Sequence, residues 1–319
     1  MGPGPWSKED RVCECPPFEV IEDVYTTREG DRGCIGRGHC ANRFVCFRLI
    51  GPTRLFPVYR PRIVPPPAPG TNRSPLLRPR IFAHVPSVTA GMSTRHGGVS
   101  GPPYDTLNLG RHVGDTASCV EENRRRFCAS LQTDPAWLAT AGQVHGSTVR
   151  VIDAPRYEPF CDGLVTTTPG LLLAIAVADC APVLLADPKH EVVGACHAGW
   201  RGTVRQIAAK TVAAMADCGA VPAQIRAYVG PCLSRTAFEV GPEVAAEFDD
   251  AVVARPQGAD RPHVDLKAAL HRQLEAAGVP GDAIEASPRC TLQDADDFFS
   301  YRAADGPTGR MFGALVLRH

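Results

Sequence analysis

The 319-residue chain lacks several features that would each point to a class of protein. It has no net charge, with 34 basic and 34 acidic residues, whereas nucleic-acid and membrane-surface binders usually carry a basic excess. Its most apolar run, residues 171–186, is interrupted by Asp179 and Pro182, so we expect no transmembrane helix. Residues 9–11 are charged and no apolar stretch follows them, which gives no sign of a secretory signal. The sequence therefore predicts a cytoplasmic protein with no nucleic-acid or membrane partner.

The cysteines also lack the patterns of a structural framework. Their number, 13, is odd, so a complete set of disulfides would leave one unpaired. Spread along a long chain, they are typical of free thiols in a reducing compartment. Five cysteines lie in the N-terminal part of the chain: Cys13, Cys15, Cys34, Cys40 and Cys46. They lack the paired C-x₂₋₄-C spacing of zinc folds, so a small metal site is the less favoured interpretation for them.

Proline content separates the N-terminal quarter of the chain from the rest. Residues 1–80 contain 13 of the 30 prolines, and five prolines lie within residues 61–69. Such a stretch neither continues a helix nor donates to a sheet, and it favours extended polyproline II. We expect residues 1–76 to form a poorly ordered extension and residues 77–319 to form one catalytic domain.

Beyond this extension, the pattern predicts a mixed α/β or α+β enzyme. Short apolar runs bounded by turn residues are typical of buried strands, and an apolar stripe that ends at a glycine is typical of a helix. The expected strands are residues 171–177, 183–186, 191–196 and 225–229. The expected helices are residues 203–218 and 265–277, the second with Asp265 as its N-cap.

Two residues with metal-ligand chemistry lie at the ends of predicted strands. Cys180 follows one strand and His197 follows another, where loops of α/β proteins usually carry their sites. His145 lies in a glycine-flanked loop. Imidazole and thiolate bind zinc, and three protein ligands leave a fourth position for water. The spacings, 35 and then 17 residues, match no zinc finger, so a loop histidine and a small buried thiol stay open as alternatives.

Three glycine-bearing loops carry arginine, whose planar guanidinium suits phosphate. Arg201 lies in residues 199–202, at the start of a predicted helix, where free N–H groups favour anions. Arg95 and Arg310 lie in the other two loops. Each loop alone is equally consistent with a tight turn that carries a surface arginine.

Taken together, these segments resemble one known family, the YfiH-type laccase-domain proteins. That family was long described as multicopper polyphenol oxidases and is associated with purine nucleoside phosphorylase and adenosine deaminase activity. The resemblance covers residues 77–319. The matching segments are residues 91–100, 107–110, 112–115, 123–124, 143–146, 162–166, 178–182, 197–202, 230–232, 238–240, 299–302 and 308–310.

The resemblance implies a fold and a set of site residues. The fold is a four-layer arrangement in which sheets pack between helices. The implied metal ligands, for zinc or alternatively copper, are His145, Cys180 and His197. The implied catalytic residues are Asp179, Arg95 and Cys180. Arg95 matches the family's arginine near the metal, and we expect it to bind phosphate together with Arg201 and Arg310 of the other two loops. Ala303 departs from the family, in which a second arginine often follows Arg302.

The implied activity is zinc-dependent phosphorolysis of purine nucleosides. Phosphate would attack C1′ of adenosine, inosine or S-methyl-5′-thioadenosine and release the base and ribose 1-phosphate. In deamination, a zinc-activated water would attack C6 of adenine while Asp179 moves protons or orients that water. The partners are then a purine nucleoside and phosphate, and the oligomeric state is left open.

Three other functions are compatible with parts of this pattern. Copper-dependent phenol oxidation fits the soft donor set, but none of the ten histidines forms the H-x-H pairs of a laccase. A hydrolase that edits peptidoglycan precursors would use Cys180 as nucleophile with a histidine base. A structural zinc scaffold that binds a partner protein is the non-enzymatic alternative.

Overall fold

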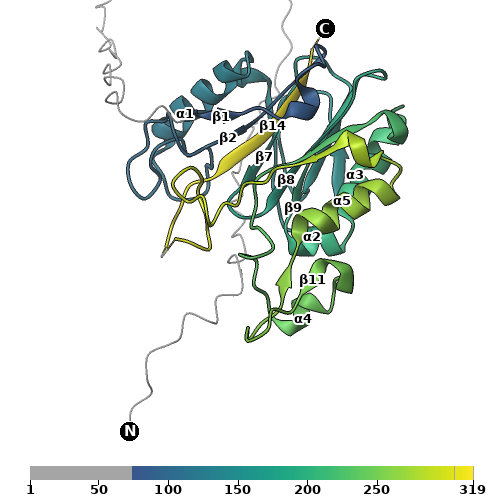
Figure 1. The fold of residues 1–319 in the computed structure, drawn as a ribbon. Coiled ribbons are helices and arrows are strands. Elements are labelled where there is room, and N and C mark those ends of the chain that lie inside the picture. Colours follow the sequence, from purple (N-terminus) through teal and green to yellow (C-terminus); the bar gives the residue numbers. More distant parts are fainter. Residues whose placement is uncertain (1–73, 305, 319) are drawn as a thin grey trace, which may run out of the picture. The chain divides into compact units, whose positions relative to one another are not determined.

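Two six-stranded sheets form the centre of the protein in this computed structural model, which describes residues 74–304 and 306–318 (Figure 1). In spatial order, the first sheet consists of β1 (Leu76–Leu77), β2 (Val88–Ser93), β14 (Met311–Leu317), β7 (Leu172–Val177), β3 (Leu138–Ala141) and β5 (Tyr157–Glu158). The second consists of β13 (Ile284–Ala286), β10 (Arg226–Val229), β8 (Ala181–Asp187), β9 (Val192–Ala198), β6 (Gly163–Thr166) and β4 (Val149–Val151). A separate small sheet pairs β11 (Val253–Ala254) with β12 (His263–Val264).

Helices cover the outer faces of both six-stranded sheets. The α-helices of the described residues are α1 (Ala117–Ser130), α2 (Trp200–Val204), α3 (Ile207–Asp217), α4 (Pro242–Ala245), which lies beside β11, and α5 (Leu266–Ala276). α1 packs on the first sheet, whereas α3 and α5 pack on the second (Figure 1). The order helix, sheet, sheet, helix gives four layers, which confirms the predicted fold class.

Side chains of the central strands alternate between two apolar cores, because successive residues of a strand point to opposite faces. In β7, Leu172 and Ala174 face α1, whereas Leu173 and Ile175 enter the core between the sheets. A strand buried on both faces needs apolar residues at nearly every position. This requirement explains the unbroken apolar runs in the sequence.

The predicted elements agree with the structure except at one helix. The four expected strands are β7, β8, β9 and β10, and the second expected helix is α5, whose N-cap Asp265 accepts a hydrogen bond from the Ala268 N–H. The single helix expected over residues 203–218 is wrong, because α2 ends at Val204 and α3 begins at Ile207. Gln206 between them has a left-handed φ of 64°. The apolar spacing continues across this break, so periodicity alone predicts one helix.

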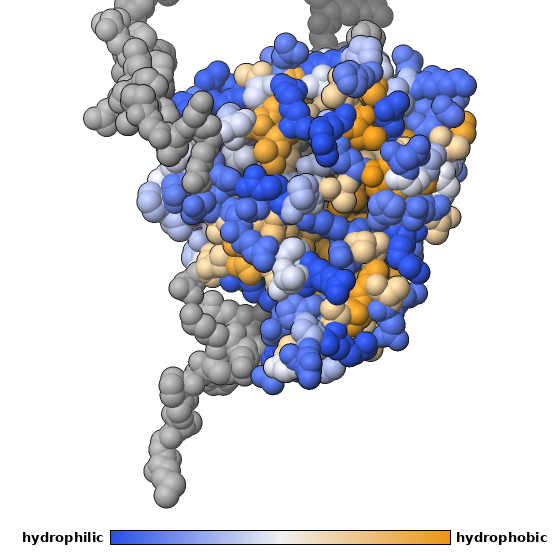
Figure 2. All heavy atoms as spheres, viewed as in Figure 1, coloured by the Kyte–Doolittle hydropathy of each residue, from blue (hydrophilic) through white to orange (hydrophobic). Residues whose placement is uncertain are grey.

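Most of the predicted extension, and all five of its cysteines, lie outside the described residues. Leu76, at its end, belongs to β1 and pairs with Ser93 of β2. Within the described ranges, no helix has the length and apolarity needed to cross a bilayer. On the face drawn in Figure 2, hydrophilic residues surround small separate groups of apolar ones.

The loops that carry the predicted site residues lie at one end of the strands of both sheets, which we call the site edge. β14 pairs antiparallel with both β2 and β7, so the end of β2, the start of β14 and the end of β7 share this edge. β3 runs parallel to β7 and ends there too. In the second sheet, the start of β8 pairs with the end of β9. Chain segments that adjoin these strand ends are therefore neighbours in space.

Candidate active site

The structure brings together the three predicted metal ligands. His145 lies in the loop after β3, Cys180 between β7 and β8, and His197 near the end of β9. Their ligand nitrogen and sulfur atoms all lie within 4.8 Å of one another. The two imidazole rings meet edge to face, with centroids 4.9 Å apart. Two imidazoles and one thiolate form a donor set for zinc with a fourth position left open, as in catalytic sites.

Gly199 leaves space beside all three ligands. A Cβ atom at this position would lie 3.1 Å from Cys180 Sγ, 3.3 Å from His145 Cδ2 and 3.9 Å from His197 Cε1. A larger residue would crowd the ligand atoms. The donor set and this adjoining space together suit a zinc ion.

Asp162 orients two of the ligands. Its carboxylate lies 2.8 Å from His197 Nδ1 and accepts the backbone N–H groups of His145 and Gly146 at 3.0 and 2.7 Å. An ionised carboxylate only accepts hydrogen bonds, so Nδ1 carries the proton and Nε2 is the nitrogen that faces the other ligands. The Asp162 side chain is fully buried. A carboxylate in this position is the usual partner of a metal-binding histidine.

Charge interactions favour a thiolate beside a protonated imidazole when no metal is bound. Burial raises the pKa of Cys180, but the nearby His197 and His145 outweigh burial and lower this pKa to about 6. Burial lowers the pKa of His197, but Cys180 and Asp162 outweigh it and raise this pKa to about 10. Burial also raises the pKa of Asp162, yet its bond to His197 holds this pKa below the usual value. At neutral pH the metal-free site therefore holds a thiolate beside an imidazolium, and a metal ion that binds there would displace the His197 proton.

A second set of contacts holds the loop that carries His145. Gln143 and His145 both adopt a left-handed backbone, with φ of 57° at each. The Gln143 side-chain amide accepts the Ala176 N–H at 2.8 Å and donates to the Ala176 carbonyl at 2.5 Å. Ala176 lies near the end of β7, the strand that leads to Cys180. The loops of two ligands are therefore tied to the same strand.

Asp179 directly precedes the ligand Cys180, but its carboxylate is bonded to other loops. Oδ1 accepts from the Thr291 hydroxyl at 2.7 Å, and Oδ2 accepts from the Arg302 N–H at 2.6 Å. The Asp179 carbonyl accepts from the Leu233 N–H at 3.1 Å, and the residue adopts a left-handed φ of 87°. These contacts anchor the turn that presents the thiolate, which is a positioning role. The proton-transfer role stays a prediction.

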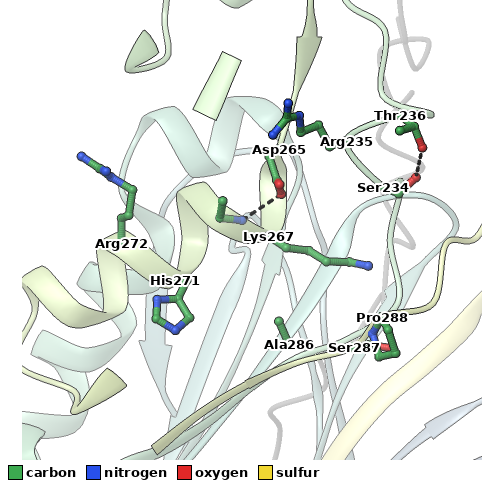
Figure 3. Close-up of a pocket in the computed structure, with 11 residues that line it drawn as sticks. Ser234, Arg235, Thr236, Asp265, Lys267, His271, Arg272, Ala286, Ser287 and Pro288 are labelled. Atoms are coloured by element: carbon green, nitrogen blue, oxygen red, sulfur yellow. Dashed lines mark hydrogen bonds between the residues drawn. The ribbon is translucent and has the colours of Figure 1, made fainter. Parts of the chain in front are cut away.

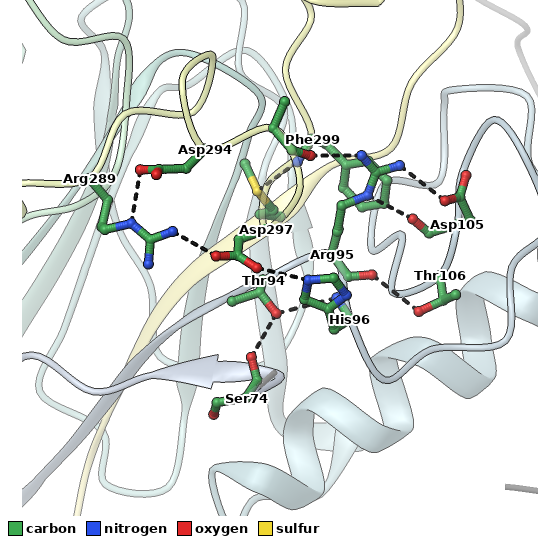
Figure 4. A network of polar contacts seen from close by, with 12 residues as sticks. Ser74, Thr94, Arg95, His96, Asp105, Thr106, Arg289, Asp294, Asp297 and Phe299 are labelled. Carbon is green, nitrogen blue, oxygen red and sulfur yellow. Dashed lines mark hydrogen bonds and ion pairs between the residues drawn. The ribbon is translucent and has the colours of Figure 1, made fainter. Parts of the chain in front are cut away.

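Arg95 follows β2 at the same edge, and its neighbours hold it in place (Figure 4). Its guanidinium donates to the Asp105 carbonyl and to the Ala295 carbonyl, each at 2.9 Å. It also lies over the Phe299 ring, 4.8 Å from the centroid. Within the described part of the chain, its one acidic partner is the Asp105 carboxylate, which lies 3.2 Å away and is 44% exposed. An anion from solvent can therefore compete for this side of the guanidinium.

A second arginine, Arg289, holds the segment that contacts Arg95 (Figure 4). Arg289 donates to Asp294 at 2.8 Å and to Asp297 at 2.7 Å. Asp297 also lies 3.0 Å from His96 Nε2, and its carbonyl accepts the Arg95 N–H. These pairs fix the backbone on which the Arg95 loop rests.

The other two predicted arginines lie on further loops of this edge. Arg201 is half-buried at the start of α2, where its guanidinium lies over the Trp200 ring, 4.6 Å from the centroid. Arg310 directly precedes β14 and donates to the carbonyls of Thr308 and Gly309. All three arginines thus adjoin the edge that carries the metal ligands, while their contact with phosphate stays a prediction.

The sequence analysis missed Asp162, Gln143 and Gly199 as site residues. Asp162 did carry a signal, since an acidic residue directly before a buried apolar strand needs a partner. Gln143 and Gly199 carry none, because their roles depend on backbone conformation and on segments distant in the sequence.

A four-layer α/β fold with a His-Cys-His cluster at one edge defines a class of metal-binding protein, and comparison with known families identifies which one. Residues 89–318 match the family model described as "Multi-copper polyphenol oxidoreductase laccase". The chain belongs to this family, the laccase-like YfiH proteins, which confirms the resemblance seen in the sequence.

Curated relatives in several bacteria are named purine nucleoside phosphorylase. The one in Deinococcus radiodurans is 44% identical over 245 residues, which cover 76% of this chain and 93% of that protein. The one in Streptomyces coelicolor is 45% identical over 233 residues, which cover 71% of this chain and 94% of that protein. These names support an enzyme of the transferase class.

Solved structures show the same fold. YfiH of Bacillus licheniformis superposes with a TM-score of 0.71 at 32% identity, covering 77% of this chain and 97% of its own. YlmD of Geobacillus stearothermophilus gives a TM-score of 0.70 at 32% identity, covering 78% of this chain and 98% of its own. The match thus extends over nearly the whole of each relative.

Proposed function

We propose that this protein is a zinc-dependent purine nucleoside phosphorylase that also deaminates adenosine. The observation that carries the proposal is the meeting of His145, Cys180 and His197 at the edge where Arg95 also lies. Arg95 follows β2 and Cys180 follows β7, and only β14 separates these two strands in the first sheet. A nucleoside at the metal site would therefore have a guanidinium on a neighbouring loop to hold phosphate. The names of the relatives supply the reaction class.

In phosphorolysis, phosphate attacks C1′ of adenosine, inosine or S-methyl-5′-thioadenosine and displaces the purine base. Arg95 holds the phosphate, because a guanidinium pairs with two of its oxygens at once. Arg201 and Arg310 add positive charge at the same edge. When bound, zinc supplies a Lewis acid and lowers the pKa of water.

In deamination, water adds at C6 of the adenine base, and the amino group leaves as ammonia. Asp179 is the carboxylate next to the ligand Cys180, and both of its oxygens are engaged by Thr291 and Arg302. Proton movement through Asp179 requires one of these hydrogen bonds to open. We therefore expect deamination to be slower than phosphorolysis.

The test is product analysis with purified zinc-loaded protein and adenosine, with and without phosphate. Adenine and ribose 1-phosphate that appear only with phosphate support phosphorolysis, and inosine formed without phosphate supports deamination. Cys180→Ala is the inactive control, and Cys128→Ala, at a buried thiol in α1, is the matched active control. An absence of turnover, or full turnover by Cys180→Ala, would contradict the proposal.

A second candidate is favoured by the low pKa of Cys180 beside His197. A thiolate next to an imidazolium is also the nucleophile of cysteine hydrolases, which would act here on an amide or ester of a peptidoglycan precursor. A metal-bound thiolate should resist thiol reagents until a chelator is added. Activity that survives chelation and is abolished by alkylation of Cys180 would favour the hydrolase.

A further inference from the structure

Two buried cysteines outside the metal site lie opposite each other. Cys232 and Cys290 are free thiols that form an isolated parallel β-bridge. The Thr291 N–H donates to the Cys232 carbonyl at 3.2 Å across this bridge. Neighbouring segments in such pairing lie about 5 Å apart, within the roughly 4.4–6.8 Å between Cα atoms that a disulfide spans. The backbone therefore already has the spacing of a disulfide.

The residues that follow these cysteines both hold Asp179, in the turn that ends at the thiolate ligand. Leu233 follows Cys232 and donates its N–H to the Asp179 carbonyl at 3.1 Å. Thr291 follows Cys290 and donates its hydroxyl to the Asp179 carboxylate at 2.7 Å. A displacement of either cysteine would therefore move the next residue, which makes a contact that positions the metal ligand Cys180.

The two thiols have different surroundings. Cys290 Sγ accepts the Ser234 N–H at 3.3 Å. Burial raises the pKa of Cys290, but hydrogen bonds from the Ser234 hydroxyl and from the N–H groups of Gln293, Ser234 and Leu292 outweigh it and lower this pKa. Burial raises the pKa of Cys232 to about 12. Cys290 is therefore the sulfur that reacts first, and the pairing across the bridge, in place of its pKa, makes Cys232 the second.

An open cavity lies beside α5, and residues that adjoin the two cysteine segments form part of its wall, although neither cysteine lines it (Figure 3). Its volume is about 570 Å³, and its wall includes Ser234, Lys267 and Ser287. Ser234 is the residue whose backbone contacts the Cys290 sulfur. The Lys267 ammonium donates to the carbonyl of Arg289, the residue before Cys290, at 2.6 Å. A small polar oxidant in this cavity would thus lie next to Ser234 and Lys267, which contact the segment that carries Cys290.

We propose that Cys232 and Cys290 are a modification site, where a hydroperoxide produces a disulfide that displaces Asp179 and loosens the ligand Cys180. With hydrogen peroxide, the Cys290 thiolate attacks one oxygen, the O–O bond breaks, and the departing hydroxide takes a proton to become water. The Cys232 sulfur then attacks the resulting sulfenic sulfur. The S–S bond forms and a second water leaves with the Cys232 proton. Two thiols are oxidised while one peroxide is reduced to two waters.

The test treats the whole zinc-loaded chain with hydrogen peroxide, alkylates the remaining thiols and maps linked peptides by mass spectrometry. We expect a peptide that joins Cys232 to Cys290 and that dithiothreitol separates. Zinc release, followed with a chromophoric chelator, should rise with the linked fraction. Oxidation at other cysteines, such as the partly exposed Cys119, without this linked peptide would overturn the proposal.

Cys232→Ser and Cys128→Ser form a matched pair, since each replaces a fully buried thiol by a hydroxyl. We expect peroxide to release zinc from Cys232→Ser several-fold more slowly than from the wild type, and from Cys128→Ser at the wild-type rate. Equal release from all three would contradict the coupling to the metal site. The Cys232–Cys290 disulfide can be mapped in the wild-type protein whether or not zinc is bound. Its formation therefore tests this proposal independently of the proposed zinc site. Only the zinc-release measurement rests on the proposed function.

Discussion

Asp162 holds His197 through both its side chain and its backbone. Its carboxylate lies 2.8 Å from the imidazole Nδ1, and its carbonyl accepts the His197 N–H at 2.7 Å. This double contact arises because β6, which follows Asp162, pairs with β9. The same carboxylate accepts the His145 N–H. One buried acid thus positions two ligands that lie on separate segments of the chain.

We expect Asp162→Asn to weaken zinc binding by about 10–100-fold, the usual effect of losing a partner that orients a metal ligand. Asparagine keeps the shape of the side chain but replaces one acceptor oxygen by a donor, so it cannot accept from all three N–H groups. The measurement is competition with a chromophoric chelator.

Asp187→Asn is the matched control for this change. Asp187 is equally buried and lies 2.7 Å from His190, outside the ligand cluster. We expect its substitution to lower stability and leave zinc affinity unchanged. If both substitutions weakened zinc binding equally, the effect would come from a general loss of structure and not from the contact between Asp162 and His197.

Removal of zinc should expose Cys180 to alkylation at neutral pH. Its pKa of about 6 in the metal-free site predicts a thiolate that predominates at pH 7. Because the thiolate is the reactive form, the alkylation rate should fall about tenfold for each pH unit below that pKa. The measurement is iodoacetamide modification mapped by mass spectrometry, with and without chelator.

Cys196 provides the internal control for this experiment. It precedes the ligand His197, but burial raises its pKa to about 12. It should stay unmodified in metal-free and zinc-loaded protein alike. Modification of Cys180 at the same rate with and without zinc would argue that its sulfur is not a metal ligand.

Thr291→Val tests whether Asp179 supports the ligand turn or moves protons. Valine keeps the shape of threonine but removes the hydroxyl that donates to the carboxylate. The loss of a partner for this buried acid should lower the free energy of unfolding by about 1–3 kcal/mol, measured by denaturant titration. If Asp179 acts as a support, zinc retention falls and the pH profile of turnover keeps its shape. A shifted pH profile with full zinc content would instead assign proton transfer to Asp179.

More of the fold than of the candidate site could be predicted from the sequence. Apolar runs predict β7, β8 and β9 because these strands are buried on both faces, and strand ends point to Cys180 and His197. Asp162 could not be placed in this way, since its role depends on the pairing of β6 with β9. The break at Gln206 is likewise hidden, because the left-handed turn does not disturb the apolar spacing. Local patterns thus predict elements, while long-range pairing decides which polar groups meet.

Asp105→Asn should strengthen the binding of phosphate if Arg95 holds it. The Asp105 carboxylate lies 3.2 Å from the Arg95 guanidinium and competes with phosphate for it, whereas the Asp105 carbonyl would keep its own bond to Arg95. We expect the KM for phosphate to fall by up to about fivefold, which corresponds to the roughly 1 kcal/mol of a partly exposed ion pair. kcat should not change. The measurement is the phosphate dependence of adenine release.

Arg95→Lys should have the opposite effect and raise the KM for phosphate several-fold, because a lysine keeps the charge but loses the planar fork. The matched control for Asp105→Asn is Asp153→Asn, which removes an exposed carboxylate 3.6 Å from Arg156. We expect this control to leave the KM for phosphate unchanged. If neither Asp105→Asn nor Arg95→Lys alters that KM, Arg95 is not the phosphate ligand, and Arg201 and Arg310 become the residues to substitute next.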